Sequence, residues 1–208
     1  MSHVLIITGG GAPKALEALH LEAYRFIVVA DSGIEFAVRH DLFADIWVGD
    51  FDSAKIKPDR VGEIIHKDHD MKLESDTELA LMIGVERGMT TYTLIGGGGY
   101  RMDHLLQTYS LFGRYGLPLA WHTKYESLYS VHRERRFITS AGRTLSFLPA
   151  SFTGRSIVNA SELVWPLESY QLTTKSISLS NRTTADLLNV TVEGDPIFLC
   201  FPVADIGP

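Results

Sequence analysis

The chain has 208 residues, enough for one large domain or two smaller ones with a sizeable buried core. Its composition, 45% hydrophobic and 21% charged, is typical of a soluble globular protein, and no stretch is apolar over the length of a membrane span. The net charge of −6 argues against a nucleic-acid partner, which favours a basic surface. A single cysteine, Cys200, excludes an internal disulfide, and the first apolar run is too short for a signal peptide, so we expect a cytoplasmic protein.

The first half of the chain alternates apolar runs with amphipathic stretches. The apolar runs predict strands at residues 3–8, 26–30, 46–48, 63–66, 91–95 and 119–122. Apolar residues at helical spacing predict helices at about 16–23, 34–40, 75–87 and 102–115. This alternation predicts a mostly parallel sheet that is covered by helices on both faces.

The pattern changes near residue 125, where the helical spacing stops and short strands with turn residues begin. Strands are predicted at 127–132, 136–139, 144–148, 154–159, 169–173, 176–180, 187–192 and 197–202. We expect a smaller antiparallel β-sandwich here. The predicted domains are residues 1–125 and 140–208, with a boundary between about 123 and 140.

Polar residues come directly after the predicted strands of the first half, or open its helices. They are the groups Asp31-Ser32-Gly33, Gly49-Asp50-Phe51-Asp52-Ser53, Glu74-Ser75-Asp76-Thr77-Glu78, and the glycine run 96–99 with Tyr100-Arg101-Met102-Asp103-His104. In parallel α/β sheets, ligands bind at the carboxyl ends of the strands. We therefore expect these groups to share one site.

The carboxylates in these groups favour a magnesium–nucleotide site. Asp50 and Asp52 are one residue apart and repel each other unless a cation or proton lies between them, and hard oxygen ligands suit Mg²⁺. Arg101, beside the glycine run, can bind phosphate bidentately. Simpler interpretations stay open at this point: a solvated acidic turn for Asp50 and Asp52, and helix caps for the acidic residues of the group around Asp76.

Five motifs, in order and spacing, resemble the thiamine pyrophosphokinase family. They are Ala30-Asp31-Ser32-Gly33, Gly49-Asp50-Phe51-Asp52-Ser53, Ser75-Asp76-Thr77-Glu78-Leu79-Ala80-Leu81, Arg101-Met102-Asp103-His104, and Ser178-Leu179-Ser180-Asn181, which follows Trp165-Pro166-Leu167. The resemblance covers nearly the whole chain.

The resemblance implies a transferase of thiamine metabolism that converts ATP and thiamine into AMP and thiamine diphosphate. It implies a homodimer with ligand sites at the interface, an N-terminal ATP- and magnesium-binding domain, and a C-terminal thiamine-binding domain. The implied magnesium ligands are Asp50, Asp52 and Asp76, which with Arg101 form the implied catalytic set. The implied substrate- and nucleotide-binding residues are Asp31, Ser53, Asp103, His104, Ser180 and Asn181.

Three positions depart from the family pattern. Ser32 and Tyr100 replace glycines, and Leu73 stands where the family usually has an aspartate, so one expected carboxylate is missing. Glu74 or Asp70 are candidates to replace it. These departures bear on the metal ligands more than on the reaction.

Thiamine is a cation, and an aromatic contact suits it. The candidates are Trp47, Tyr100, Trp121 and Trp165, with core packing the expected role of Trp47 and Trp121.

Three other functions fit the sequence less well. In a haloacid-dehalogenase-type phosphatase the paired aspartates follow the first strand, with Thr or Val at the fifth position; here they follow the third strand, and Ala54 is at that position. A glycosyltransferase that binds a sugar nucleotide would not require the Arg101 or Ser180 motifs. A non-catalytic nucleotide sensor would not need three acidic groups.

Overall fold

The computed structural model of the chain describes residues 2–14, 24–52, 54, 56, 59–67, 73–98 and 101–203. The chain divides into two compact units, Met1–Tyr125 and Glu126–Pro208. The helix predicted at about 16–23 lies outside the described residues. In the part of the chain that is described, no helix is long and apolar enough to cross a membrane.

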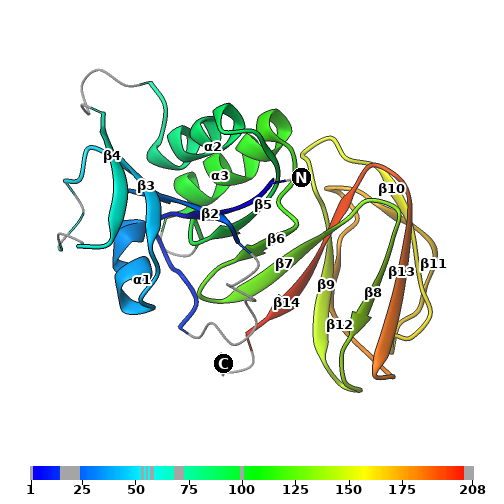
Figure 1. Cartoon of the computed structure of the whole chain (residues 1–208). Helices are drawn as coiled ribbons and strands as arrows, with labels where there is room; N and C mark the ends of the chain where they lie inside the picture. The colour runs from blue at the N-terminus through cyan, green and yellow to red at the C-terminus, as the bar shows by residue number, and fades with distance from the viewer. Residues whose placement is uncertain are drawn as a thin grey trace. The chain divides into compact units, whose positions relative to one another are not determined.

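The first unit is built on a parallel sheet. Its strands are β1 (Ser2–Ile7), β2 (Phe26–Ala30), β3 (Ala44–Gly49), β4 (Val61–His66), β5 (Met89–Ile95) and β6 (Ala120–His122). They pair in the order β6-β5-β1-β2-β3-β4, each pair parallel. The helices are α1 (Ile34–Arg39), which follows the 3-10 turn η2 (Asp31–Gly33), α2 (Asp76–Glu86) and α3 (Met102–Tyr115). Figure 1 shows α2 and α3 on one face of this sheet and α1 on the other, which confirms the predicted α/β arrangement.

Both faces of this sheet are buried. Leu5 and Val29 are fully buried in a cluster that includes Phe36 of α1, and the alternate residues Ile6 and Val28 are fully buried as well. A strand buried on both faces is apolar at successive positions, which explains why the sequence showed runs here and not alternation.

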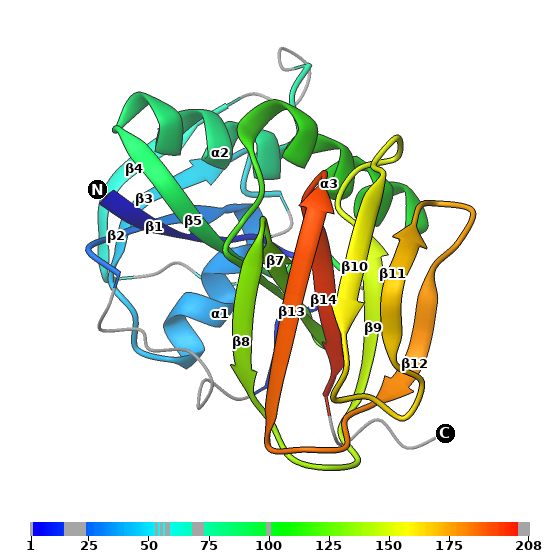
Figure 2. The same ribbon diagram turned by 90° about the vertical axis from the view of Figure 1, so that its right-hand side faces the viewer.

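The second unit is a sandwich of two antiparallel layers. Its strands are β7 (Glu126–Val131), β8 (Glu134–Ile138), β9 (Thr144–Pro149), β10 (Ser156–Ala160), β11 (Leu167–Leu172), β12 (Ser178–Arg182), β13 (Leu187–Gly194) and β14 (Ile197–Pro202). One layer pairs in the order β12-β9-β14-β7, and the other in the order β11-β10-β13-β8. Figure 2 shows β13 and β10 in front of β14 and β9. Side chains from both layers, including Phe147, Val158 and Leu199, form one core, so the predicted sandwich is confirmed.

The strands β3 and β4 begin before their predicted ranges, because polar residues and glycines hid their first residues. β3 begins at Ala44, where Asp45 interrupts the apolar run; the Asp45 carboxylate accepts a hydrogen bond from the backbone N–H of Ile27 at 2.7 Å. β4 begins at Val61 and contains Gly62. A Cβ atom at Gly62 would lie 2.8 Å from the carbonyl oxygen of Asp45, so this close strand pairing favours glycine.

Candidate active site

A pocket of about 740 Å³ in the first unit collects the segments that follow the parallel strands. It is lined by the ends of β1, β2, β3 and β5, by the start of α2, and by the first two turns of α3. The predicted site residues in its lining are Asp31, Asp50, Asp52, Asp76, Arg101 and His104. Asp103 is not in the lining, Ser180 and Asn181 belong to the second unit, and Ser53 lies outside the described residues.

Asp31, Asp50 and Asp52 form one cluster in this pocket. Each offers a carboxylate oxygen, and these three oxygens lie within 4.8 Å of one another. Asp31 comes from the end of β2, whereas the other two come from the end of β3, so the pairing of these neighbouring strands brings the cluster together. Three hard oxygen donors at this separation suit a divalent cation.

The backbone around the cluster is fixed by close packing. Gly49 has φ 150°, and a Cβ atom there would lie 3.3 Å from the backbone of Asp31. The indole N–H of Trp47 donates to the carbonyl oxygen of Asp31 at 3.0 Å. Asp31 and Phe51 themselves have positive φ angles of 40° and 64°. Non-glycine residues hold such angles only where their surroundings impose them, and these positions concentrate at functional sites.

Asp31 is a cluster residue whose charged form is disfavoured by its surroundings. Its side chain is 9% exposed, and its Oδ1 atom is buried without a hydrogen-bond partner among the described residues. Burial raises the pKa of Asp31; a hydrogen bond from the Ser32 backbone opposes this rise, and the charges of Asp76, Asp50 and Asp52 add to it. A cation bound at the cluster would offset both the burial and the repulsion.

The start of α2 presents Asp76 to the pocket. Ser75 is the N-cap residue, and its hydroxyl oxygen accepts from the backbone N–H of Glu78 at 3.2 Å and from Nε2 of Gln107 on α3 at 2.8 Å. The Thr77 hydroxyl lies 2.7 Å from the hydroxyl of Thr8, which follows β1. Asp76 therefore sits on a helix terminus that is attached to both α3 and β1.

Glu78 does not line the pocket. Its carboxylate is buried and pairs with the guanidinium of Arg114 at 2.6 Å, and it accepts from the hydroxyl of Tyr115 at 3.0 Å. Of the residues considered as caps or ligands at this helix start, Ser75 takes the cap position, Asp76 lines the pocket, and Glu78 joins α2 to α3.

Two glycine segments pack backbone to backbone at the floor of the pocket. The N–H of Gly97 donates to the carbonyl oxygen of Gly9 at 2.8 Å, and the N–H of Gly96 donates to His122 at 2.9 Å. A Cβ atom at Gly96, which has φ 87°, would lie 2.1 Å from the carbonyl oxygen of Thr8. Glycine is therefore required at this contact. Tyr100, which departs from the family pattern, lies outside the described residues.

The other two departures from the family pattern line the pocket. A Cβ atom at Gly9 would lie 2.2 Å from the hydroxyl of Ser32, so the side chain of Ser32 fills the space that a residue at Gly9 would take. Leu73 is fully exposed at the pocket, so no carboxylate is present at that position. Glu74 also lines the pocket, whereas Asp70 lies outside the described residues.

Arg101 is held by Asp103 at the mouth of the pocket. Its Nε and Nη2 atoms donate to the two carboxylate oxygens of Asp103 at 3.1 and 2.5 Å, and both side chains are exposed. The hydrogen bond from Arg101 lowers the pKa of Asp103 to about 2. Asp103 thus orients the cation, and it is Arg101 that faces the pocket.

Thr8, Gln107 and Thr108 also line the pocket, although no sequence motif predicted them. Thr8 follows a strand end, and Gln107 and Thr108 lie three and four residues after His104. One helical turn places such residues on the same side of a helix, so this spacing was a usable signal.

The two predicted residues of the second unit differ in exposure. Ser180 is exposed, with φ 54°, and its N–H donates to the hydroxyl of Ser146 at 3.0 Å. Asn181 is 2% exposed, and its amide bonds to the backbone of Trp165, whose own side chain is 56% exposed.

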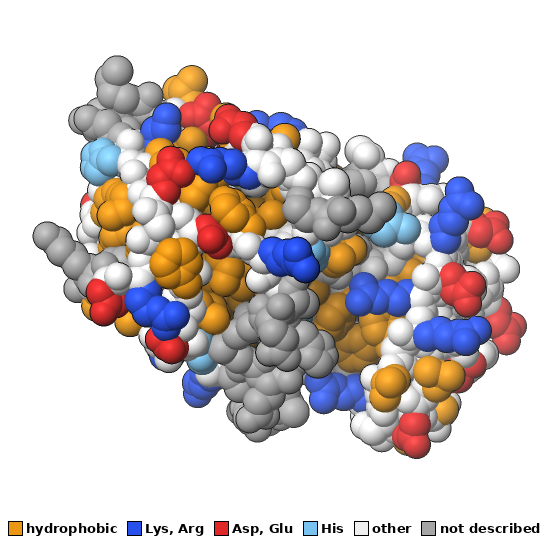
Figure 3. Space-filling view, viewed as in Figure 1, with side chains coloured by type: hydrophobic (Ala, Val, Ile, Leu, Met, Phe, Trp, Pro, Cys, Tyr) orange, Lys and Arg blue, Asp and Glu red, His pale blue; other side chains and the backbone are white. Residues whose placement is uncertain are grey.

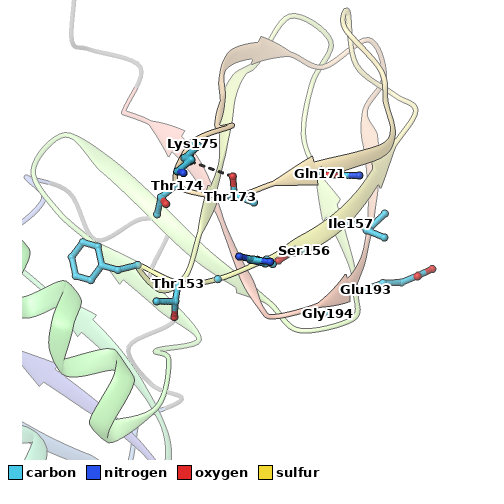
Figure 4. Close-up of a pocket in the computed structure, with 12 residues that line it drawn as sticks. Thr153, Ser156, Ile157, Gln171, Thr173, Thr174, Lys175, Glu193 and Gly194 are labelled. Carbon is cyan, nitrogen blue, oxygen red and sulfur yellow. Dashed lines mark hydrogen bonds between the residues drawn. The ribbon is translucent and has the colours of Figure 1, made fainter.

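A second hollow, of about 750 Å³, lies within the second unit (Figure 4). Thr153 and Lys175 lie toward one side of it, and Gln171 and Glu193 toward the other. None of the site residues predicted from the sequence lines it.

Known proteins that carry one family name resemble this chain. Residues 18–117 match the family model described as the catalytic domain of thiamin pyrophosphokinase. A thiamine pyrophosphokinase structure from Bacillus subtilis has a TM-score of 0.78 at 18% identity, covering 97% of this chain and 99% of that one. The structure of a thiamin pyrophosphokinase family protein from Enterococcus faecalis has a TM-score of 0.77 at 19% identity, and the match covers 98% of this chain and 100% of that one. The structure of thiamin pyrophosphokinase from Candida albicans has a TM-score of 0.72 at 18% identity, and the match covers 97% of this chain and 89% of that one.

No curated protein sequence matches the chain. The solved structures establish the fold, and the family model covers the segment that holds the whole acidic cluster, the start of α2 and the Arg101 turn. Residues 18–117 thus match the catalytic domain of the thiamine pyrophosphokinase family, and the chain shares the fold of solved structures that carry that name.

Proposed function

We propose that the chain transfers the diphosphoryl group of ATP to the hydroxyl group of thiamine, giving thiamine diphosphate and AMP. The match to the family's catalytic domain supports this reaction. The observation that carries it to this pocket is the cluster of Asp31, Asp50 and Asp52 beside two glycine segments and a cation, Arg101. Such a set suits a nucleotide whose phosphates are neutralised by a metal and by an arginine.

The residues present fit a magnesium ion. Asp31 has a buried, unpartnered carboxylate oxygen, and Asp50 and Asp52 bring further hard donors within 4.8 Å of it. We propose these three residues as the ligand set, with Asp76 beside them in the same pocket. The charge of Asp76 contributes to the raised pKa of Asp31, which supports its closeness to the cluster. When bound, magnesium would neutralise phosphate oxygens and hold the phosphates for attack.

The chain's own residues bind and orient the nucleotide. The backbones of the Gly9–Gly10 and Gly97–Gly98 segments line the pocket and leave room for phosphates to approach closely. Arg101 supplies positive charge at the pocket mouth, and Asp103 holds its guanidinium in a fixed plane. His104 lines the pocket one turn further along and is a proposed substrate contact.

The transfer needs no covalent intermediate on the enzyme. The thiamine hydroxyl oxygen attacks the β-phosphorus, the bond from that phosphorus to the oxygen bridging to the α-phosphate breaks, and the hydroxyl proton is released. Positioning and charge neutralisation then account for the rate.

Trp165 is the aromatic side chain that we propose for thiamine. Trp47 and Trp121 are 6% and 3% exposed, and their indole N–H groups donate to backbone carbonyl oxygens, as expected of core residues. Trp165 is 56% exposed and lies beside the Ser178–Asn181 motif of the second unit. An exposed indole face suits a cationic ring. This gives the second unit the thiamine-binding role and the first unit the ATP-binding role.

We further propose a cytoplasmic homodimer in which the ligand sites lie at the interface and use both units, as the resemblance implies. Neither a nucleic acid nor a membrane is a proposed partner. Over the second unit, on the right of Figure 3, basic and acidic side chains are interspersed. A nucleic-acid surface would instead gather basic side chains along one face.

The reaction is tested by incubating the purified protein with ATP, Mg²⁺ and thiamine and separating the nucleotides. We expect AMP and thiamine diphosphate in equal amounts, and no AMP when thiamine or Mg²⁺ is omitted. ADP as the product would indicate transfer of a single phosphoryl group, and AMP formed without thiamine would indicate hydrolysis. Either result contradicts the proposal.

A further inference from the structure

Asn181 holds the backbone of Trp165 from both sides. Its Oδ1 atom accepts from the N–H of Trp165 at 3.2 Å, and its Nδ2 atom donates to the carbonyl oxygen of Trp165 at 2.7 Å. Oδ1 also accepts from the N–H of Arg182 at 2.8 Å, and the N–H of Val164 donates to the carbonyl oxygen of Arg182 at 2.8 Å. We call Trp165, Asn181 and Arg182 the Trp165 corner. Its backbone is fixed by a buried amide.

A bulge in β12 turns Asn181 toward this corner. Ser178 pairs with Phe147 of β9 and Asn181 pairs with Leu145, so three residue steps on β12 match two on β9. The extra residue falls where Ser180 has φ 54°. Because side chains alternate along a strand, one inserted residue reverses the side on which the following residues face. Asn181 is buried as a result, at 2% exposure.

The next residue, Arg182, places its cation on the ring of Trp165. The guanidinium carbon lies 5.9 Å from the ring centroid, and both side chains are exposed. Within the described parts of the chain, the Arg182 guanidinium makes no ion pair. The indole ring is therefore its only charge-stabilising contact among those residues, at a distance typical of a cation–π interaction.

We propose that Arg182 is a specificity-determining residue: it occupies the cation-binding face of Trp165, and thiamine has to displace it in order to stack there. This inference rests on the proposed function, which gives thiamine to Trp165. Both cations favour the electron-rich face of the indole ring, and two cations cannot occupy the same face at once. The side chain of Arg182 can swing away because it is exposed, whereas Asn181 keeps the backbone of Trp165 in place.

The test uses the full-length protein and the substitution Arg182→Gln, which removes the cation but keeps a long polar side chain. An exposed cation–π contact corresponds to about a two- to fivefold change in an equilibrium constant, so we expect the KM for thiamine to fall by that factor. The KM for ATP should not change. Arg182→Lys, which keeps a cation, should remain near the wild type. Arg136→Gln is the matched control, because it removes an exposed positive charge elsewhere in the second unit.

A second readout is independent of thiamine. Trp47 and Trp121 are buried, so quenching of tryptophan fluorescence by caesium ions reports on Trp165, and Trp165→Phe gives the background. Caesium quenching should increase in Arg182→Gln, and more than quenching by neutral acrylamide.

The outcomes separate this inference from the proposed function. Caesium quenching that stays at the wild-type level in Arg182→Gln overturns the cation contact. Increased quenching with an unchanged or higher KM for thiamine overturns the competition, while thiamine-dependent AMP formation by the wild type still supports the proposed function. If the wild type forms no AMP with thiamine, the proposed function fails and the competition for thiamine fails with it.

Discussion

The acidic cluster of the first unit and the Trp165 corner of the second unit each contain a buried polar side chain. The two differ in whether the polar atoms of that side chain have hydrogen-bond partners. In the cluster, Asp31 has a buried oxygen without a partner among the described residues, and its pKa is raised by burial and by neighbouring carboxylates. In the Trp165 corner, both ends of the Asn181 amide are bonded to backbone groups. The cluster is thus incomplete by itself, and the corner is complete.

This difference distinguishes a group that binds from a group that supports. A buried polar atom without a partner costs free energy, and a cation bound at the cluster would offset that cost for Asp31. A fully bonded amide has nothing left to offer a ligand through those atoms, but it can hold the residue that does. We therefore expect substitutions in the two regions to affect activity and stability in opposite ways.

The largest expected effect follows from Asp52→Asn in the cluster. Loss of one metal-binding carboxylate should lower kcat/KM by about 10²–10³-fold or more, the range seen when one electrostatic group is removed from an active site. The fold should not be weakened. Asp52 is one of the charges that raise the pKa of Asp31, so its neutralisation relieves repulsion, and without Mg²⁺ the urea midpoint should stay equal or rise.

Asp59→Asn is the matched control, since Asp59 is an exposed carboxylate that does not line the pocket. Addition of Mg²⁺ should stabilise the wild type and this control by mass action, and Asp52→Asn much less. Full activity in Asp52→Asn, or equal stabilisation by Mg²⁺ in all three proteins, would remove Asp52 from the metal site.

The second largest expected effect is a loss of folding stability at acidic pH that arises in the first unit and not in the Trp165 corner. His122 ends β6, and its carbonyl oxygen accepts from the N–H of Gly96. The residue is 4% exposed, and burial lowers the pKa of its side chain to about 4. Between the unfolded pKa of about 6.5 and this value, the unfolded chain binds more protons than the native one. Stability from the neutral histidine is therefore present above pH 6.5 and is lost as the pH falls toward 4. The loss amounts to about 2–3 kcal/mol.

Urea unfolding of the wild type and of His122→Gln, followed at pH 7 and at pH 4.5, tests this effect. The free-energy difference between the two proteins should shift by about 2–3 kcal/mol in favour of the variant at the lower pH. The neutral Asn181 amide gives the Trp165 corner no such dependence. A difference that is constant with pH would show that His122 titrates alike in both states.

The apolar pattern was sufficient to predict the layers of both units. Strands buried on both faces gave the continuous runs of the first unit, and half-buried strands between turn residues gave all eight strands of the second. The residues at which strands begin were harder to predict. Asp45 and Gly62 belong to strands for reasons that lie in neighbouring strands, a side-chain bond to Ile27 and a close backbone approach, and a single-sequence pattern does not contain those contacts.

The candidate site was likewise predicted in part: the positions of its residues follow from local sequence, whereas the surroundings of two of them do not. Six predicted residues line one pocket because each lies beside the carboxyl end of a strand or at a helix start, which is a property of local sequence. The environments of Asp31 and Asn181 could not be read in this way. The burial of Asp31 depends on the Gly49 contact, and that of Asn181 depends on a bulge in β12, so both require knowledge of how strands pair.

The smallest expected effect is the loss of stability in Asn181→Ala. The change leaves the N–H and carbonyl groups of Trp165 without their partner, which should lower the free energy of unfolding by about 1–2 kcal/mol in urea titration. Asn159→Ala is the control: it removes one bond, to the N–H of Ser169, which is exposed to water, and should cost less. Because Trp165 would no longer be held, the KM for thiamine should rise in Asn181→Ala, in contrast to the fall expected for Arg182→Gln. A variant as stable as the wild type would mean that the corner does not depend on this amide, and the contrast between an incomplete cluster and a complete corner would no longer hold.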